Sequence, residues 1–248
     1  RILQDDPSLE NAGLLIFDEF HERSIHADLG LALALESREH LCKDLRILVM
    51  SATLEEEPLS RLLGGAPVIF CEGKNFPVET RFLPQDRRAK EKDRYNVLSR
   101  TKSVVLKALR EERGDILVFL PGAGEIRRLE KALKETGIDG DIHIAPLYGN
   151  LSKEEQDSAI LPSSSGQRKI VLATSIAETS LTIEGIRIVI DCGLRRVSRF
   201  SPGSGMSRLE TLPVTKASAH QRRGRAGRLE PGVCYRLWTK EDDRQLKI

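Results

Sequence analysis

The strongest constraint on the fold is a series of short apolar runs of strand length, separated by longer amphipathic stretches. Strands that are apolar throughout, rather than alternating with polar residues, are typical of parallel sheets buried on both faces. The stretches between them, near residues 27–40, 96–112, 124–136 and 152–160, have the spacing of helices. The pattern predicts an α/β protein with a doubly wound parallel sheet. The expected strands are Leu14–Phe17, Ile47–Met50, Val68–Phe70, Ile116–Leu120, Ile142–Ala145, Ile170–Ala173 and Ile188–Ile190.

Three parts of the chain interrupt this pattern. Arg195–Ser201 and Met206–Leu212 partly alternate apolar with polar residues on either side of Pro202–Gly205, which predicts an inserted β-hairpin. A domain boundary is expected around Cys71–Pro77, where a glycine, an asparagine and a proline disfavour regular structure. The polar stretch Pro84–Arg94 is expected to be an exposed loop or linker.

Composition and cysteine usage limit the class of protein. Hydrophobic residues make up 40% and charged residues 31% of the 248-residue chain, as in ordinary soluble proteins. No apolar run reaches the roughly 18 residues of a membrane span. Cys42, Cys71, Cys192 and Cys234 lie far apart, which favours reduced thiols and a cytoplasmic location. The chain begins at Arg1 without a methionine or a signal peptide, which we interpret as a piece of a longer protein.

The net charge of +2 hides an uneven distribution. Residues 1–72 carry 6 basic and 14 acidic side chains, whereas residues 187–228 carry 10 basic and 2 acidic ones. All but one of the cations in the second stretch are arginines, which bind phosphate through paired hydrogen bonds. The stretch suggests contact with a polyanion, although a solvated basic surface is the more usual explanation.

Two carboxylates, Asp18 and Glu19, directly follow the first predicted strand. Ligands of open parallel sheets bind outside the carboxyl ends of the strands, and adjacent strand residues point in opposite directions. One carboxylate can therefore hold Mg²⁺ through water while the other activates an attacking water. A strand that merely ends in polar residues is the alternative. His21 and His26 do not form a zinc-protease pair, because that pair requires a spacing of four residues.

Hydroxyl side chains follow two further predicted strands. Ser51 and Thr53 come directly after Ile47–Met50, where they can hydrogen-bond the carboxylates or the linker, or Thr53 can simply cap a helix. Five more hydroxyls lie in Ala173–Gly185, after another apolar run. Hydroxyls and backbone N–H groups in such loops bind phosphate oxygens, and a polar loop that caps a helix is the alternative.

The segment Gln221–Arg228, Q-R-R-G-R-A-G-R, is the most specific feature. Thr215 is a suitable N-cap for a helix that starts at Lys216. If that helix continues, Gln221, Arg225 and Arg228 share one stripe, with the arginines directed at a γ-phosphate and the glutamine near the attacking water. The two glycines are expected where the backbone approaches a partner closely. An Arg/Gly-rich nucleic-acid-binding tail is the alternative.

In this order and spacing, the segments resemble the motifs of DEAH-box superfamily 2 ATP-dependent helicases over nearly the whole chain. Asp18–His21 resembles motif II, the Walker B box, and Ser51–Thr53 resembles motif III. Ile116–Gly122 is similar to motif IV, Ala173–Gly185 to motif V and Gln221–Arg228 to motif VI. Motifs V and VI are highly specific for this class.

The sequence departs from the usual pattern at Phe20, where alanine is common, and at Glu184, where aspartate is common. With these departures the chain most resembles the bacterial HrpB-type helicases. The resemblance implies tandem RecA-like domains. Residues 1–72 would be the C-terminal part of the first, ATP-binding domain, and residues 73–248 most or all of the second, with the β-hairpin inserted near the point of strand separation.

The resemblance also implies roles for individual residues. Glu19 would be the general base, and Asp18 would bind Mg²⁺ through water. Ser51 and Thr53 would couple hydrolysis to domain movement, and Thr174 and Thr179 would contact the nucleic-acid backbone. The catalytic set would be Glu19, Gln221, Arg225 and Arg228. The ATP-binding set would be Asp18, Glu19, His21, Ser180, Thr182, Glu184, Gln221, Arg225 and Arg228.

One motif of the class is missing, because no segment matches the P-loop pattern G-x-x-x-x-G-K-[ST]. We expect it upstream of Arg1, and we expect this chain to be inactive alone. The parent would be an enzyme, a nucleic-acid-stimulated ATPase that uses ATP and Mg²⁺ to move on or unwind RNA or DNA. Its partner would be single-stranded or partly duplex nucleic acid, not a membrane, and it would act as a monomer. A non-catalytic RecA-like nucleic-acid-binding scaffold is the alternative.

Overall fold

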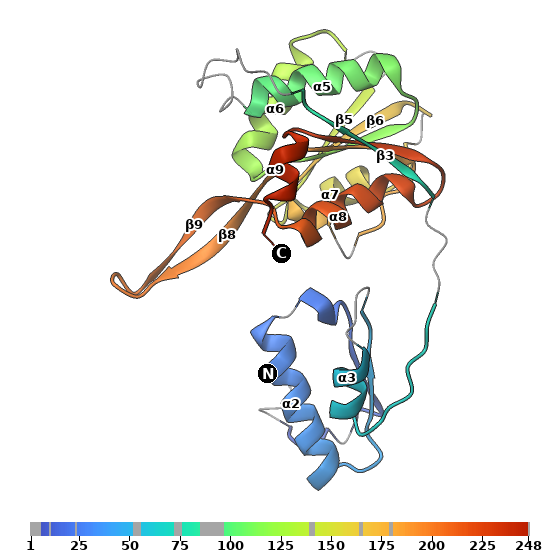
Figure 1. Cartoon of the computed structure of the whole chain (residues 1–248), viewed down its shortest axis with the longest axis vertical. Coiled ribbons are helices and arrows are strands. Elements are labelled where there is room, and N and C mark those ends of the chain that lie inside the picture. The colour runs from blue at the N-terminus through green and yellow to red at the C-terminus, as the bar shows by residue number, and fades with distance from the viewer. Residues whose placement is uncertain are drawn as a thin grey trace. The chain divides into compact units, whose positions relative to one another are not determined.

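The computed structural model describes the chain except for residues 1–5, 10, 23, 52–55, 72–75, 85–96, 139–141, 164–165, 179–180 and 248, and the side chains of Glu22 and Glu56. The chain forms two compact units, Arg1–Glu72 and Gly73–Ile248, which are described separately (Figure 1). The predicted linker Pro84–Arg94 lies almost entirely outside the described residues.

The first unit is built on two parallel strands, β1 (Leu14–Phe17) and β2 (Arg46–Val49), in register from Leu14 opposite Arg46 to Phe17 opposite Val49. The helix α2 (Ile25–His40) connects them, as the amphipathic pattern predicts. It begins where the Ser24 side chain accepts a hydrogen bond from the Ala27 N–H, which satisfies an otherwise unpaired donor of the first turn. A short 3₁₀ turn η1 (Phe20–Glu22) and the helix α3 (Glu56–Leu62) complete the unit.

The predicted strand Val68–Phe70 is wrong. These residues have no regular structure, and Ile69 and Phe70 are 88% and 71% exposed. The chain before them is tied to the end of α3 instead: the Ser60 hydroxyl donates to the Ala66 carbonyl at 2.8 Å, and the Ala66 N–H donates to the Ser60 carbonyl. A strand is defined by its ladder to a neighbour, so three apolar residues are too weak a signal by themselves.

The second unit is a doubly wound α/β domain with a six-stranded sheet of order β3-β10-β7-β4-β6-β5, in which every pair of neighbours is parallel. The predicted fold class is confirmed. The four strands expected from apolar runs are β4 (Asp115–Phe119), β5 (Ile142–Leu147), β6 (Arg168–Ala173) and β7 (Ile186–Asp191). The sequence did not indicate β3 (Val78–Phe82) and β10 (Gly232–Arg236), because both mix polar with apolar residues.

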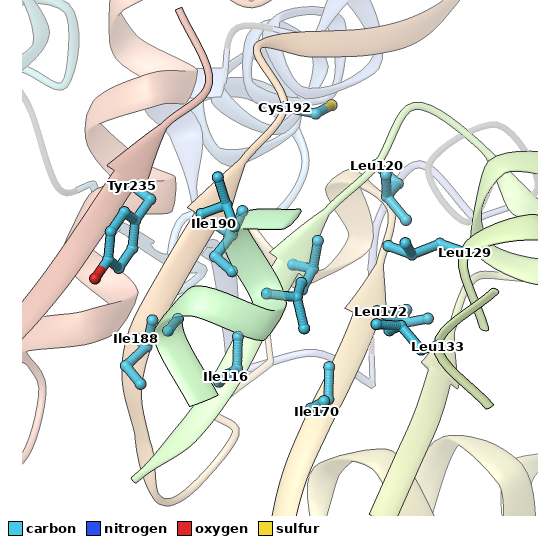
Figure 2. Close-up of a cluster of buried hydrophobic side chains, with 14 of the residues drawn as sticks. Ile116, Leu120, Leu129, Leu133, Ile170, Leu172, Ile188, Ile190, Cys192 and Tyr235 are labelled. Atoms are coloured by element: carbon cyan, nitrogen blue, oxygen red, sulfur yellow. The ribbon is translucent and has the colours of Figure 1, made fainter. Parts of the chain in front are cut away.

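Helices cover both faces of this sheet (Figure 1). On one face lie α5 (Val97–Glu111) and α6 (Ala123–Lys134), and on the other α7 (Lys153–Ile160) and α8 (Lys216–Gly224). Alternate residues of one strand serve the two cores: Ile116 and Val118 pack with α5 and α6, whereas Leu117 and Phe119 pack on the opposite side. Figure 2 shows the first core, in which Leu129 and Leu133 of α6 lie beside Leu120 and Leu172, and Ile188 lies nearer Ile116. Burial on both faces explains the unbroken apolar runs.

The predicted hairpin is confirmed. The antiparallel strands β8 (Leu194–Ser201) and β9 (Met206–Pro213) pair from Leu194 opposite Pro213 to Ser201 opposite Met206. The Gly205 N–H donates to the Ser201 carbonyl at 2.9 Å, and Gly205 has a φ of +64°, which glycine adopts without strain. The hairpin extends away from the body of the second unit (Figure 1). None of the helices that the structure describes is long and apolar enough to cross a membrane.

Candidate nucleotide and nucleic-acid site

The acidic segment after β1 folds as a strained turn. Asp18 is exposed, and its Oδ1 accepts a hydrogen bond from the Glu19 N–H at 2.8 Å. Glu19 has a φ of +49°, a left-handed conformation that costs a residue with a side chain about 1–3 kcal/mol. The two carboxylates lie directly beyond the strand, as predicted, but Glu19 lacks the extended backbone on which the alternation of adjacent strand residues depends. Strain of this kind concentrates at functional sites.

Residues around this turn hold it against the end of β2. The Phe20 N–H donates to the Met50 carbonyl at 3.0 Å, so the segment that contains Asp18 and Glu19 lies beside the segment that begins with Ser51. Phe20 is buried and meets Phe17 edge to face, with ring centroids 6.4 Å apart. The His21 Nε2 lies 3.5 Å from the Glu19 carboxylate. Thr53, the second predicted coupling hydroxyl, lies outside the described residues.

The donor set of this turn fits Mg²⁺. An exposed carboxylate such as Asp18 offers hard oxygen ligands while leaving room for water. Among the described residues no cluster of three or more histidine, cysteine, aspartate or glutamate side chains forms a metal cage. Magnesium ordinarily needs none, since one or two carboxylates with waters and substrate phosphates complete its shell.

In the second unit, the hydroxyl-rich segment follows β6 as predicted. Thr174 is half-buried and precedes the 3₁₀ turn η2 (Ser175–Ala177), while Thr182 and Glu184 are exposed on the approach to β7. Thr179 and Ser180 lie outside the described residues.

The helix α8 begins as predicted, with the Thr215 side chain accepting a hydrogen bond from the Ser218 N–H at 3.2 Å. It ends at Gly224, and the chain tightens into the 3₁₀ turn η3 (Arg225–Gly227). The condition for one helical stripe from Gln221 to Arg228, an α-helix that continues through Arg228, is therefore not met. The close approach expected at the glycines is real at Gly227, where a Cβ atom would lie 2.5 Å from the Phe76 carbonyl oxygen. That partner is the protein's own backbone beside β3.

The arginines nevertheless meet the hydroxyl-rich segment. Arg225 is 6% exposed, and its guanidinium donates to the carbonyls of Leu181, at 2.5 Å, and of Glu178. The exposed Arg228 donates from Nη1 to the Thr182 hydroxyl at 2.7 Å. Two segments more than 40 residues apart in the sequence thus form one hydrogen-bonded unit on one face of the sheet. The half-buried Gln221 lies one turn earlier in α8.

Beside this unit lies a buried ionic cluster that was not predicted from the sequence. Arg222 is completely buried, donates from Nε to Glu178 at 2.7 Å and from Nη1 to Asp191 at 2.7 Å, and lies 4.9 Å from the centre of the Phe119 ring. Burial lowers the pKa of Arg222, but the carboxylates of Asp191 and Glu178 outweigh that effect and raise it. The one available signal was an aspartate at the end of an apolar strand, Asp191, which burial would force to find a cation.

Comparison with known proteins supports a helicase assignment. Residues 98–230 match the helicase conserved C-terminal domain. The chain is 51% identical over 241 residues to the ATP-dependent RNA helicase HrpB of Escherichia coli (strain K12), covering 97% of this chain and 29% of that protein. It is 39% identical over 240 residues to an ATP-dependent RNA helicase HrpA homolog of Haemophilus influenzae (strain ATCC 51907 / DSM 11121 / KW20 / Rd), covering 97% of this chain and 18% of that protein.

Solved structures agree. The crystal structure of the Escherichia coli DEAH/RHA helicase HrpB matches with a TM-score of 0.87 and 49% identity, over 100% of this chain and 31% of that one. A structure of the E. coli DExH-box NTPase HrpB matches with a TM-score of 0.83 and 48% identity, over 100% of this chain and 30% of that one. The chain belongs to the family of the helicase conserved C-terminal domain. Within that family, its sequence and fold match the DEAH-box helicases of the HrpB type, as the motifs predict.

Proposed function

We propose that the protein containing this chain is an ATP-dependent RNA helicase or translocase and that this chain supplies part of its motor core. The observation that carries the proposal is the direct bonding of Arg225 and Arg228 to the segment Glu178–Thr182. Arginines and hydroxyls held together in this way can bind phosphate oxygens, and a shift of one segment would then move the other. We propose RNA rather than DNA as the substrate because the similar HrpB and HrpA proteins are named RNA helicases.

In this proposal the first unit, as the C-terminal part of an ATP-binding domain, supplies the acidic side of the ATP site. Asp18 would hold Mg²⁺ through water, and the bound ion would neutralise charge on the β- and γ-phosphates. Glu19 would accept a proton from the attacking water, with His21 beside its carboxylate to fix its orientation. Ser51, whose segment touches the acidic turn through the Phe20 to Met50 hydrogen bond, would sense the state of that turn.

The second unit, as the helicase C-terminal domain, would supply the cationic side. Arg225 and Arg228 would stabilise the negative charge that develops on the transferred phosphoryl group, and Gln221 would orient the attacking water. Ser180, Thr182 and Glu184 would contact the nucleotide. Thr174 and Thr179 would bind the RNA backbone, and the extended hairpin would meet the nucleic acid where strands separate. The four cysteines are unpaired, which supports a cytoplasmic location, and we propose a monomer.

The test is RNA-stimulated ATP hydrolysis by the full-length protein, compared with single-stranded DNA as the stimulant. Replacing Arg225 with methionine, which fills the buried volume without charge, should lower kcat by a factor of about 10³ or more. Binding of single-stranded RNA should change less than threefold. Normal turnover with weakened RNA binding would mean that Arg225 serves nucleic-acid contact instead.

One observation favours a second candidate, a non-catalytic RecA-like scaffold that binds nucleic acid. Arg225 is nearly buried and donates to two backbone carbonyls, as an arginine with a purely structural role would. A scaffold of this kind would bind RNA with no ATP turnover in the full-length protein. It would also leave the strained backbone at Glu19 without a purpose, because nothing in a binding module requires that conformation.

A further inference from the structure

Glu178 is held by two arginines, Arg222 near the end of α8 and Arg225 at the start of η3. Its side chain, 12% exposed, accepts from Arg222 Nε at 2.7 Å and from the Ser218 hydroxyl at 2.9 Å. Its backbone carbonyl accepts from the guanidinium of Arg225. One residue therefore connects Arg222 to Arg225 by a route that does not follow the helix.

Arg222 is in turn fixed by groups that cannot move easily. Its Nη1 donates to the completely buried Asp191 at 2.7 Å and to the Leu194 carbonyl at 3.2 Å. The same Asp191 oxygen accepts from the Gly193 N–H at 2.9 Å, immediately before β8 begins. The guanidinium is thus anchored to the end of β7 and to the root of the hairpin.

A buried ionic cluster of this kind is not explained by stability alone. Taking charges out of water is costly, and apolar residues of similar volume often stabilise a core as well or better. The cluster does fix the orientation of its side chains, because the planar fork of an arginine sets the orientation of each carboxylate that it binds.

We propose that Arg222 and Glu178 are positioning residues, which fix the Glu178 peptide group and thereby aim the guanidinium of Arg225 at the γ-phosphate of ATP. The inference rests on the proposed function of Arg225. Neither residue needs to touch the nucleotide. Arg222 also binds the Leu194 carbonyl at the root of the hairpin. The orientation of Arg225 is therefore tied, through Arg222, to the element proposed to meet the nucleic acid.

The experiment compares Glu178→Ala and Arg222→Lys in the full-length protein. The alanine variant keeps the backbone carbonyl but removes its tether, and the lysine variant keeps the charge but loses the fork. Each should lower the RNA-stimulated kcat at least tenfold while changing the KM for ATP less than threefold, because an arginine aimed at the transition state contributes little to ground-state binding. The matched control is Arg223→Lys, one residue along the same helix, where the arginine donates to the Val78 carbonyl at 2.9 Å and kcat should stay within twofold.

The decisive measurement repeats Glu178→Ala in an Arg225→Met background under single-turnover conditions. If Glu178 acts through Arg225, its replacement should then change the rate less than twofold, whereas an independent structural role would lower the rate by the same factor in both backgrounds. Equal factors would overturn the inference. A normal kcat for both Glu178→Ala and Arg222→Lys, with Arg225→Met inactive, would also overturn the inference. That outcome would leave the proposed function unaffected. Unchanged turnover in Arg225→Met would refute the role of Arg225 itself.

Discussion

At the scale of single residues, burial rather than residue type decides what each charged or reactive group does. Lys169 is completely buried, yet its ammonium donates to the carbonyls of Ala159 and Leu161, which closes the end of α7. Such carbonyls lack partners within their own helix, so a buried lysine can replace water there. Burial lowers the pKa of Lys169, and the nearby Asp115 opposes that shift.

Burial also distinguishes two of the cysteines, Cys192 and Cys234, from the exposed Cys71. Burial raises the pKa of both Cys192 and Cys234 to about 12, whereas Cys71 is exposed. We expect iodoacetamide at pH 8.5 to alkylate Cys71 rapidly in the native protein and to reach Cys192 and Cys234 only after unfolding, because only the thiolate reacts. Mass spectrometry of peptides from native and urea-unfolded samples measures this, with Cys71 as the internal control. Equal native rates at Cys234 and Cys71 would contradict it.

The same shifts predict a dependence of stability on pH. Unfolded thiols have a pKa of about 8.5, whereas Cys192 and Cys234 stay protonated in the folded protein until about pH 12. Their contribution is therefore fully present below the unfolded pKa and is lost as the pH rises toward the folded one. The urea midpoint should fall between pH 9 and pH 11, and it should fall less steeply in Cys234→Ala. An equal slope in that variant would be inconsistent with this cause.

At the scale of elements, the basic stretch 187–228 is only in part the solvated face that its composition favours. Arg222 lies in the core, and Arg199 and Arg208 of the hairpin both pair with Glu210. Arg196 pairs with Glu125 at the start of α6, at 3.3 Å. The stretch runs through a strand, a hairpin and a helix, so its charges are distributed among different partners instead of forming one surface.

The two glycines of the η3 region should respond in opposite ways to alanine. At Gly227 the new methyl would lie 2.5 Å from the Phe76 carbonyl and 2.6 Å from Val78, so Gly227→Ala should lower the free energy of unfolding by about 1–3 kcal/mol. The control Gly224→Ala meets nothing within 4 Å at the end of α8 and should be neutral or stabilising by up to about 1 kcal/mol. Urea unfolding of the chain followed by circular dichroism measures both. A tolerated Gly227→Ala would show that β3 can move aside.

At the scale of the whole molecule, the proposed ATP site needs groups from more than this chain. The sequence contains no P-loop, the element that cradles the β- and γ-phosphates in enzymes of this kind. We expect the 248-residue chain by itself to hydrolyse ATP no faster than a buffer blank, with or without RNA. Phosphate release from the purified chain measures this, with the full-length protein as the positive control. Turnover that rises with chain concentration and disappears in Arg225→Met would contradict the expectation.

The sequence by itself determined the fold class, four of the six strands of the second unit, the hairpin, and the resemblance to DEAH-box helicases. These follow from patterns local to the chain: unbroken apolar runs, a turn between alternating segments, and a dense motif. It did not determine β3 and β10, which become strands only because neighbouring ladders accept them, nor the loss of Val68–Phe70, which has no such ladder.

Only the tertiary structure decided that Glu19 adopts a left-handed backbone and that Glu178, Asp191 and Arg222 form one buried cluster. The physical reason is common to both. Burial, ion pairing and backbone strain depend on which distant segments come together, and a local pattern of residue types carries no information about that meeting.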